Sequence, residues 1–176
     1  MAVRSLGLFC AASETIDALY VQVGHLVGSL GITLVYGGAK AGLMETTAAA
    51  AKEKGAHIVG VFPRILIERN RVSELPDEKV VTENLSDRKD NILLRSDVLL
   101  ALPGGVGTLD EVFHVMAAAT IGYHRKRVIF YNVNGFWDGI LAQLDSFRKA
   151  GFVRGNADSY YTVANNIAEL EELLKG

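Results

Sequence analysis

Apolar and polar positions change their spacing in a regular way along the chain. Short apolar runs alternate with longer stretches in which apolar residues recur every three or four positions, so the pattern predicts strands alternating with helices. Strands are predicted at residues 6–10, 32–36, 57–62, 79–82, 98–102, 127–133 and 160–163. Helices are predicted at residues 13–30, 43–54, 84–95, 107–120, 136–149 and 166–174.

This alternation is typical of parallel strands joined by crossover helices. It predicts an α/β fold with a doubly wound, Rossmann-like, mostly parallel sheet and helices on both faces. A length of 176 residues with 49% apolar residues suits one sizeable core, so we expect a single Rossmann-like domain over residues 1–176. Ligands in such folds bind at the carboxyl ends of the strands.

Several residues mark the expected ends of the helices. Ser13 is predicted to cap the first helix, Gly31 to end it, and Asn165 to cap the last helix. Residues 63–78 lose both hydrophobic patterns and carry many charges. We interpret this segment as a surface excursion near a site, able to act as a flap.

The charge composition narrows the classes of partner. The formal net charge is −2, with 18 basic and 20 acidic residues mixed along the chain. No basic field is available to attract a phosphate backbone, so we expect no nucleic-acid partner. The apolar stretch near the N-terminus is too short for a signal segment or a membrane span, which favours a cytoplasmic protein with no membrane partner.

Cysteine and histidine usage gives no support for a metal site. Cys10 is the single cysteine, which excludes an internal disulfide, and we interpret it as a small buried hydrophobe. The four histidines show no zinc-binding spacing. His114 lies three residues beyond Glu111, and a surface or core position is favoured over a place in the site.

Two glycine-rich turns follow predicted strands. The first, residues 37–42, can offer backbone N–H groups to an anion, but tight packing also explains its glycines, and the pattern leaves both open. The second, Pro103-Gly104-Gly105-Val106-Gly107-Thr108, places several amides and a hydroxyl at a helix start, which suits a 5'-phosphate. It lacks the lysine of a P-loop, and an ordinary helix start is the alternative.

Charged residues flank the second turn in the sequence. Asp110 and Glu111 fall in the first turns of the next helix, close to any anion that the turn holds. A carboxylate there is unfavourable unless it serves a developing positive charge, such as the oxocarbenium-like sugar of glycosidic cleavage. The alternative is that both acids favour the positive end of the helix dipole. Arg88 can point into the same cleft, although a solvated helix face explains it equally well.

The combination of Arg88-Lys89 with Pro103-Gly104-Gly105-Val106-Gly107-Thr108-Leu109-Asp110-Glu111 resembles the LOG family. These are cytokinin riboside 5'-monophosphate phosphoribohydrolases, often mislabelled lysine decarboxylases, with the pattern P-G-G-x-G-T-x-x-E. The resemblance covers nearly the whole chain, including Leu8-Phe9-Cys10, Tyr36-Gly37-Gly38 and Gly42-Leu43-Met44. It implies that Arg88 and Glu111 form the catalytic pair. It also implies substrate-binding roles for Lys89, Gly104, Gly105, Val106, Gly107, Thr108 and Asp110.

The chain departs from the family pattern at several positions. Leu85 and Ile92 replace the methionines of the family's M-x-x-R-K-x-x-M helix, and we expect both to pack inward. Ala11, Ala12 and Ser13 follow Cys10, where the family commonly has glycine and serine next. Ala39 and Glu45 stand where the family often has glycine. These departures concern substrate identity more than fold.

The resemblance implies hydrolysis of the N-glycosidic bond of a nucleoside 5'-monophosphate, either AMP or an N6-modified AMP, to free base and ribose 5-phosphate. No metal or organic cofactor is required for such a reaction, and the family implies a homodimer or higher homo-oligomer. An alternative from another class is a non-catalytic carrier of a phosphate-bearing cofactor, as in the related molybdenum-cofactor carriers. A pyridoxal-dependent decarboxylase needs a Schiff-base lysine, for which we find no motif.

Overall fold

The computed structural model describes residues 2–11, 18–40, 42–153 and 159–176. Within these ranges one sheet contains seven strands, all parallel, in the order β4-β3-β2-β1-β5-β6-β7. The strands are β1 (Ser5–Phe9), β2 (Thr33–Tyr36), β3 (Ile58–Pro63), β4 (Glu78–Thr82), β5 (Val98–Ala101), β6 (Val128–Tyr131) and β7 (Tyr161–Ala164). The helices are α1 (Ala18–Ser29), α2 (Gly42–Glu53), α3 (Arg64–Glu68), α4 (Leu85–Leu94), α5 (Val106–Thr120), α6 (Asp138–Lys149) and α7 (Ile167–Lys175), with a 3₁₀ turn η1 (Val133–Gly135). The predicted doubly wound α/β fold is confirmed.

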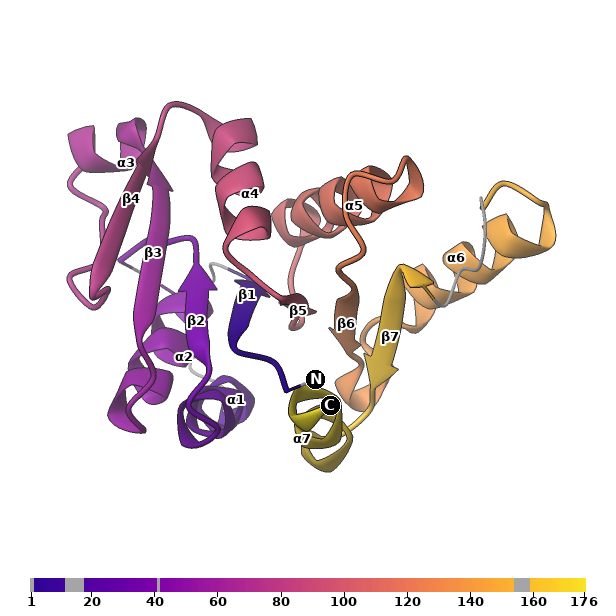
Figure 1. Cartoon of the computed structure of the whole chain (residues 1–176), viewed down its shortest axis with the longest axis horizontal. Coiled ribbons are helices and arrows are strands. Elements are labelled where there is room, and N and C mark those ends of the chain that lie inside the picture. The colour runs from indigo at the N-terminus through magenta and orange to yellow at the C-terminus, as the bar shows by residue number, and fades with distance from the viewer. Residues whose placement is uncertain (1, 12–17, 41, 154–158) are drawn as a thin grey trace.

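Helices cover both faces of the sheet (Figure 1). One buried core joins the sheet to α1, α2 and α7, and the other joins it to α4, α5 and α6. Strand β1 shows why both faces are apolar: Leu6 and Leu8 belong to the first core, whereas Phe9 belongs to the second. Successive side chains of a strand point to opposite faces, so a parallel strand covered on both sides needs apolar residues at every position.

The strand order reverses between β1 and β5. Residues Leu6 to Phe9 pair with Val98 to Ala101 in the middle of the sheet. The chain then leaves β1 and β5 toward opposite faces, and this divergence opens a crevice at the carboxyl ends of the two strands. Cys10 directly follows β1 at this edge, and the turn before α5 directly follows β5. The fold therefore brings Cys10 and the turn before α5 to the edge of the sheet where doubly wound folds bind their ligands.

The charged segment between β3 and β4 is more ordered than its sequence pattern predicts. It contains α3, a helix of five residues that is too short for periodicity to reveal. The segment then returns along the turn after β2, where the N–H of Lys40 donates to the carbonyl of Arg71 (2.9 Å) and the N–H of Ser73 donates to that of Gly38 (2.8 Å). Its action as a flap stays a prediction.

The starts of two helices differ from the predictions. Asn166, not Asn165, caps α7: its side chain accepts from the N–H of Glu169 (3.0 Å), whose carboxylate accepts from the N–H of Asn165 (2.8 Å). The helix predicted from residue 136 begins at Asp138, because a 3₁₀ turn with Asn134 at φ 52° precedes it. The predicted cap at Ser13 lies outside the described residues.

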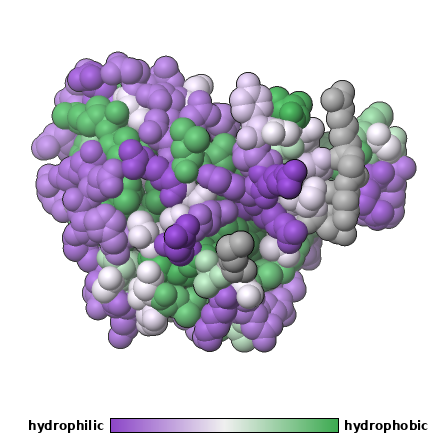
Figure 2. Space-filling view, viewed as in Figure 1, coloured by the Kyte–Doolittle hydropathy of each residue, from purple (hydrophilic) through white to green (hydrophobic). Residues whose placement is uncertain are grey.

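Polar side chains predominate on the face of the molecule shown in Figure 2. Hydrophobic residues, in green, gather over α3 and β4, over the end of α5 and in the lower centre of the view. Ile65, Ile67 and Val81 are exposed in the first of these regions, and Ile121 is exposed in the second. Within the described ranges, each helix falls short of the length and apolar character needed to cross a membrane.

Candidate active site

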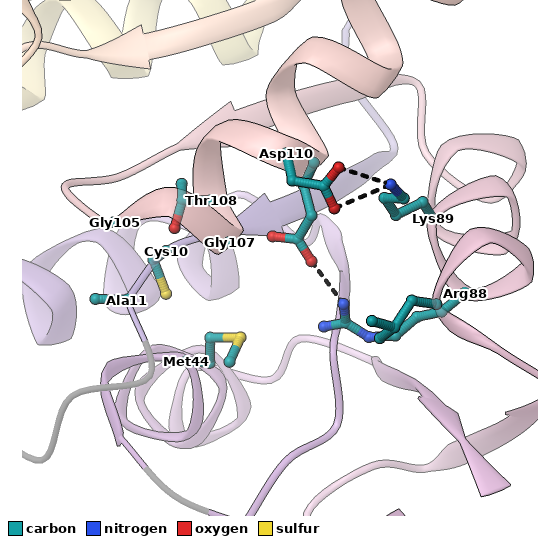
Figure 3. A pocket seen from close by; sticks show the side chains of 11 residues that line it. Cys10, Ala11, Met44, Arg88, Lys89, Gly105, Gly107, Thr108 and Asp110 are labelled. Atoms are coloured by element: carbon teal, nitrogen blue, oxygen red, sulfur yellow. Dashed lines mark hydrogen bonds and ion pairs between the residues drawn. The ribbon is translucent and has the colours of Figure 1, made fainter. Parts of the chain in front are cut away.

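A cavity of about 450 Å³ lies at the carboxyl ends of β1 and β5, at the point where the strand order reverses. Its wall combines residues from the loop after β1 and from α2, α4 and the start of α5 (Figure 3). The lining residues are Cys10, Ala11, Met44, Leu85, Arg88, Lys89, Gly105, Gly107, Thr108, Asp110 and Glu111. Most of the predicted site residues therefore lie in one cavity.

The glycine-rich turn before α5 presents backbone to this cavity. Gly105 is the N-cap residue of α5 and has an extended conformation. As a glycine it has no side chain that could cap the helix. The first amides of a helix have no intrahelical acceptor, so those at the start of α5 are available to an anion. A methyl group on Gly105 or Gly107 would meet no atom within 4 Å, so a ligand can approach the backbone at both positions.

Gly104 has a different role from the next two glycines in the turn. A Cβ at this position would lie 2.1 Å from Oγ1 of Thr108 and 3.0 Å from the amide nitrogen of Ala11. Gly104 therefore allows the turn to close over the buried Thr108 side chain, and it does not line the cavity. Val106 does not line it either, and its side chain is exposed to solvent.

Arg88 and Glu111 form an ion pair across the cavity. Nη1 of Arg88 donates to Oε1 of Glu111 at 2.7 Å, and only 13% and 10% of the two side chains are exposed. Nε of Arg88 also donates to the carbonyl oxygen of Val61 on β3 (3.2 Å). Arg88 lies one turn into α4, whose start is fixed by the Asn84 side chain as N-cap. The guanidinium is therefore held from two sides in a defined orientation.

Gly37 forms the wall behind the Arg88 guanidinium. A Cβ on Gly37 would lie 1.9 Å from Nη2 of Arg88 and 3.0 Å from its Cζ. The sequence pattern of the first glycine-rich turn fits either anion binding or packing, and at Gly37 the geometry is that of packing. The pattern gave no sign of this contact, because the two residues are far apart in the sequence and on different elements.

Lys89 and Asp110 form a second ion pair beside the first. Nζ of Lys89 donates to both carboxylate oxygens of Asp110, at 2.9 Å each. Lys89 is mostly covered, with 14% of its side chain exposed, whereas 58% of the Asp110 side chain is exposed. Consecutive residues of α4 thus pair with consecutive residues of α5, and the two helices are clamped together at the mouth of the cavity (Figure 3).

Burial changes the acid-base behaviour of two groups in the cavity. Burial raises the pKa of Glu111, and the positive charge and hydrogen bond of Arg88 oppose part of that change. Burial also raises the pKa of Cys10 strongly, and the negative charge of Glu111 adds to the effect. The Cys10 thiol therefore stays protonated near neutral pH, in agreement with its interpretation as a buried hydrophobe.

Part of the apolar lining was not predicted from the sequence. Met44 and Ala11 line the cavity, and the only earlier signal for either was its position within or next to the family motifs. The prediction that Leu85 packs inward is wrong, because Leu85 is the first residue of α4 and is 62% exposed at the cavity. The inward prediction is correct for Ile92, which is buried.

The histidines lie outside the cavity, to the extent that the structure describes its lining. His114 contacts Asp90 of α4, with Nε2 at 2.8 Å from the carboxylate, and both residues line a second cavity. Across the described ranges, no three side chains among histidine, cysteine, aspartate and glutamate come together as a metal site.

Comparisons with known proteins agree with the motif. The family model described as "Possible lysine decarboxylase" matches residues 44–174. A "probable cytokinin riboside 5'-monophosphate phosphoribohydrolase" of Oryza sativa subsp. japonica is 34% identical over 98% of this chain and 72% of its own length. The cytokinin riboside 5'-monophosphate phosphoribohydrolase of Mycobacterium tuberculosis is also 34% identical, over 94% of this chain and 90% of its own length.

Solved structures with the same fold include molybdenum-cofactor proteins. The molybdenum cofactor binding protein of Rippkaea orientalis gives a TM-score of 0.71 at 23% identity and covers 99% of this chain and 97% of its own. The molybdenum cofactor carrier protein of Chlamydomonas reinhardtii gives 0.72 at 24% identity, with coverage of 97% and 95%. At these identities the likeness concerns the fold alone. The family match and the phosphoribohydrolase relatives place this chain in the LOG family, whose model carries the lysine decarboxylase label.

Proposed function

We propose that this protein hydrolyses the N-glycosidic bond of a nucleoside 5'-monophosphate and releases the free base and ribose 5-phosphate. The observation that carries the proposal is the buried Arg88–Glu111 ion pair, which lies in the same cavity as the exposed amides at the start of α5. The names of the relatives support the same reaction.

The turn before α5 is proposed to bind the 5'-phosphate. Gly105 and Gly107 leave their backbone open to a ligand, and the helix start adds its positive dipole end. Thr108 lies in the cavity wall and can add its hydroxyl. Lys89 is proposed to contact the substrate from the opposite helix, with Asp110 fixing its ammonium group beforehand.

Glu111 is proposed to act on the ribose. As the bond from C1' to the base nitrogen breaks, its electron pair leaves with the base and positive charge develops on the sugar. The Glu111 carboxylate stabilises that charge and orients the attacking water through the ribose hydroxyls. The water oxygen bonds to C1', and one of its protons ends on the departing base. Preorganised charge in a covered site supplies on the order of 3–4 kcal/mol toward such a step.

Arg88 is proposed to keep Glu111 ionised and in place. Without a nearby cation, a carboxylate covered to this degree takes up a proton too readily to stabilise a sugar cation. Arg88 lines the cavity, and it is also proposed to stabilise the phosphate or the departing base. The reaction as proposed uses side chains, backbone amides and water, and it requires no metal or organic cofactor.

The proposed substrate class is AMP or an N6-modified AMP such as a cytokinin riboside 5'-monophosphate. The test is incubation of purified protein with AMP, N6-isopentenyl-AMP and adenosine, with chromatography of the free base and an assay of ribose 5-phosphate. We expect equal amounts of both products from the monophosphates and little from adenosine, which lacks the phosphate. Absence of free base from every monophosphate at high protein concentration would refute the proposal.

Variants connect the activity to the pair. Glu111→Gln keeps the shape of the side chain and removes its charge, so we expect turnover to fall by about 100-fold or more. Arg88→Ala is expected to fall similarly. Glu53→Gln is the matched control, because Glu53 is an exposed glutamate at the end of α2 that contacts His25 outside the cavity. Equal activity of Glu111→Gln and Glu53→Gln would remove Glu111 from the mechanism.

The same incubation separates the alternatives. A carrier of a phosphate-bearing cofactor would retain its ligand through purification and show no turnover. The likeness in fold is the support for that function. A pyridoxal enzyme needs a free lysine amine at the cavity. Among the described lining residues the lysine is Lys89, which both oxygens of Asp110 already engage. An absorption band of a lysine-bound cofactor would contradict our proposal.

We further propose a cytoplasmic homodimer or larger homo-oligomer. The far ends of α4 and α5 leave Leu94, Ile121 and Tyr123 largely exposed around a second cavity of about 630 Å³, and exposed apolar groups of this kind favour association. Sedimentation of the wild-type protein should give at least twice the monomer mass of 19.0 kDa. A monomer at micromolar concentration would refute this proposal and leave the catalytic one standing.

A further inference from the structure

Glu45 occupies an unusual position behind the cavity wall. It lies in the first turn of α2, next to the cavity-lining Met44. Its carboxylate accepts a hydrogen bond from the hydroxyl of Tyr36 (2.9 Å) and another from the hydroxyl of Ser73 (2.6 Å). Both donors are fully buried, so the carboxylate joins the end of β2 to the segment between β3 and β4.

These bonds enclose the turn that follows β2. Tyr36 directly precedes Gly37, and Ser73 reaches the turn from the other side, where its own N–H donates to the carbonyl of Gly38 (2.8 Å). The hydroxyl of Ser73 also accepts from the N–H of Leu75 (3.0 Å), which fixes its orientation. The backbone of Gly37 and Gly38 is therefore held from both ends by groups that meet at Glu45.

Gly37 is also the residue against which the Arg88 guanidinium packs. There is no space for even a methyl group between them, so any shift of the Gly37 backbone toward Arg88 displaces the guanidinium, and a shift away leaves it unsupported. A continuous set of contacts thus runs from Glu45 through Tyr36 and Gly37 to Arg88, and from Arg88 to Glu111.

We propose that Glu45 is a positioning residue for the reaction, which sets the place of the Arg88 guanidinium through the backbone of Gly37. The proposal rests on the function proposed above, because it assigns a kinetic consequence to the position of Arg88. Glu45 does not line the cavity, so it acts without touching the substrate. A carboxylate on α2 thereby stabilises the turn after β2.

A positioning role predicts a specific kinetic result. In Glu45→Ala the Tyr36 and Ser73 hydroxyls lose their shared acceptor, and Arg88 loses its fixed wall. We expect kcat for AMP to fall by about tenfold while KM changes by less than about twofold, because the phosphate-binding turn is on another element. Glu45→Gln keeps one acceptor oxygen and should recover most of kcat. Glu53→Ala, at the other end of α2, should match the wild type.

A second measurement reports on Arg88 without any turnover. The Nε–H of Arg88 donates to the carbonyl of Val61, so its NMR signal is expected to exchange slowly with solvent and is assigned by its loss in Arg88→Lys. In Glu45→Ala this signal should shift and exchange faster, and in Glu53→Ala it should not. If Glu45→Ala does not fold, Tyr36→Phe removes one of the two donors and should give a smaller change of the same kind.

The outcomes separate this proposal from the function itself. If wild-type protein cleaves no monophosphate, the proposed function fails, and the Arg88 signal still tests whether Glu45 positions the guanidinium. If folded Glu45→Ala retains both the wild-type kcat and the wild-type Arg88 signal, the positioning role is overturned. A rise in KM with kcat unchanged would also overturn it, because that result would assign Glu45 to substrate binding.

Discussion

Replacing Gly37 with alanine adds one methyl group behind the Arg88 guanidinium and tests whether the position of Arg88 controls activity. Gly37 is outside the set of glycines with positive φ, so its backbone conformation accepts alanine without strain. The effect of the substitution therefore comes from contact alone. The added Cβ meets Nη2 of Arg88 first, at 1.9 Å, and this atom is the far end of a flexible side chain.

The displacement follows from the geometry. Ordinary van der Waals contact begins at about 3.4 Å, so the guanidinium has to retreat by roughly 1.5 Å. A movement of that size breaks the 2.7 Å bond to Glu111 or the 3.2 Å bond to Val61. A misplacement of about 1 Å at a catalytic group costs up to about 100-fold in rate. We expect kcat/KM of Gly37→Ala to fall by about 10- to 100-fold, or about 1.4–2.7 kcal/mol of transition-state stabilisation.

The assay is release of adenine from AMP, measured at several substrate concentrations. Gly139→Ala is the matched control, because Gly139 lies on α6 with no atom within 4 Å of an added Cβ. That control should keep wild-type activity and gain about 0.5–1 kcal/mol of stability, as expected for alanine replacing glycine in a helix. Overpacking in Gly37→Ala should cost about 1–3 kcal/mol, which chemical denaturation measures.

A double-mutant cycle decides whether the loss acts through Arg88. In an Arg88→Ala background the methyl group of Gly37→Ala has nothing to displace, so it should cause little further loss of kcat/KM. Additive losses would show that the methyl group acts by another route. Wild-type kcat/KM in folded Gly37→Ala would refute the argument that the Arg88 position limits the rate.

Three further predictions follow from the cavity and its surroundings. Because burial raises the pKa of Glu111 and Arg88 opposes that change, Arg88→Gln should move the acid limb of the kcat/KM profile to higher pH; an unmoved limb would contradict the proposed pairing. Gly104→Ala places a Cβ 2.1 Å from Oγ1 of Thr108, so it should raise KM for AMP at least tenfold while adenosine binding, measured by calorimetry, changes little. Burial lowers the pKa of His124, so as pH falls its imidazole takes up a proton in the unfolded chain before it does so in the folded one. The free energy of unfolding should therefore decline as pH falls below 6.5. His124→Asn should flatten this decline in denaturant titrations.

Much of the fold could be predicted from the sequence because the strands are covered on both faces. A run such as Leu99, Leu100 and Ala101 is apolar at every position, and the structure buries all three residues. Most predicted boundaries agree with the observed elements to within about two residues. Helix α3 escaped prediction because five residues show no period. The late start of α6 escaped because the positive φ of Asn134 is a local conformation with no hydrophobic signature.

Part of the candidate site could likewise be predicted from the sequence, and part could not. The motif places Glu111 at the start of α5, and local rules explain why a turn of small residues precedes it. No spacing rule brings Arg88 to within 2.7 Å of Glu111, because the two lie on different helices and meet only through the packing of α4 against α5. The contact of Gly37 with Arg88 and the bonds of Glu45 depend on how the turn after β2, the segment between β3 and β4, and helices α2 and α4 come together. Such contacts become visible only in three dimensions.

In the proposed reaction, the pairing of charges in the cavity leaves recognition of the phosphate mainly to backbone amides. Arg88 is engaged by Glu111 and Lys89 by Asp110, so the four groups cancel in pairs. A phosphate dianion therefore meets little net positive charge from these side chains, and the start of α5, equivalent to about half a positive charge, becomes the main attraction. In the proposed reaction, the positive charge of Arg88 favours the charged form of Glu111 against the effect of burial, which raises the pKa of that carboxyl. A cavity with unpaired cationic side chains would bind anions more tightly, and it would bind polyphosphates as readily as monophosphates. In the proposed reaction, the paired arrangement gives up affinity for the phosphate and supports the charged form of Glu111 beside the bond that breaks.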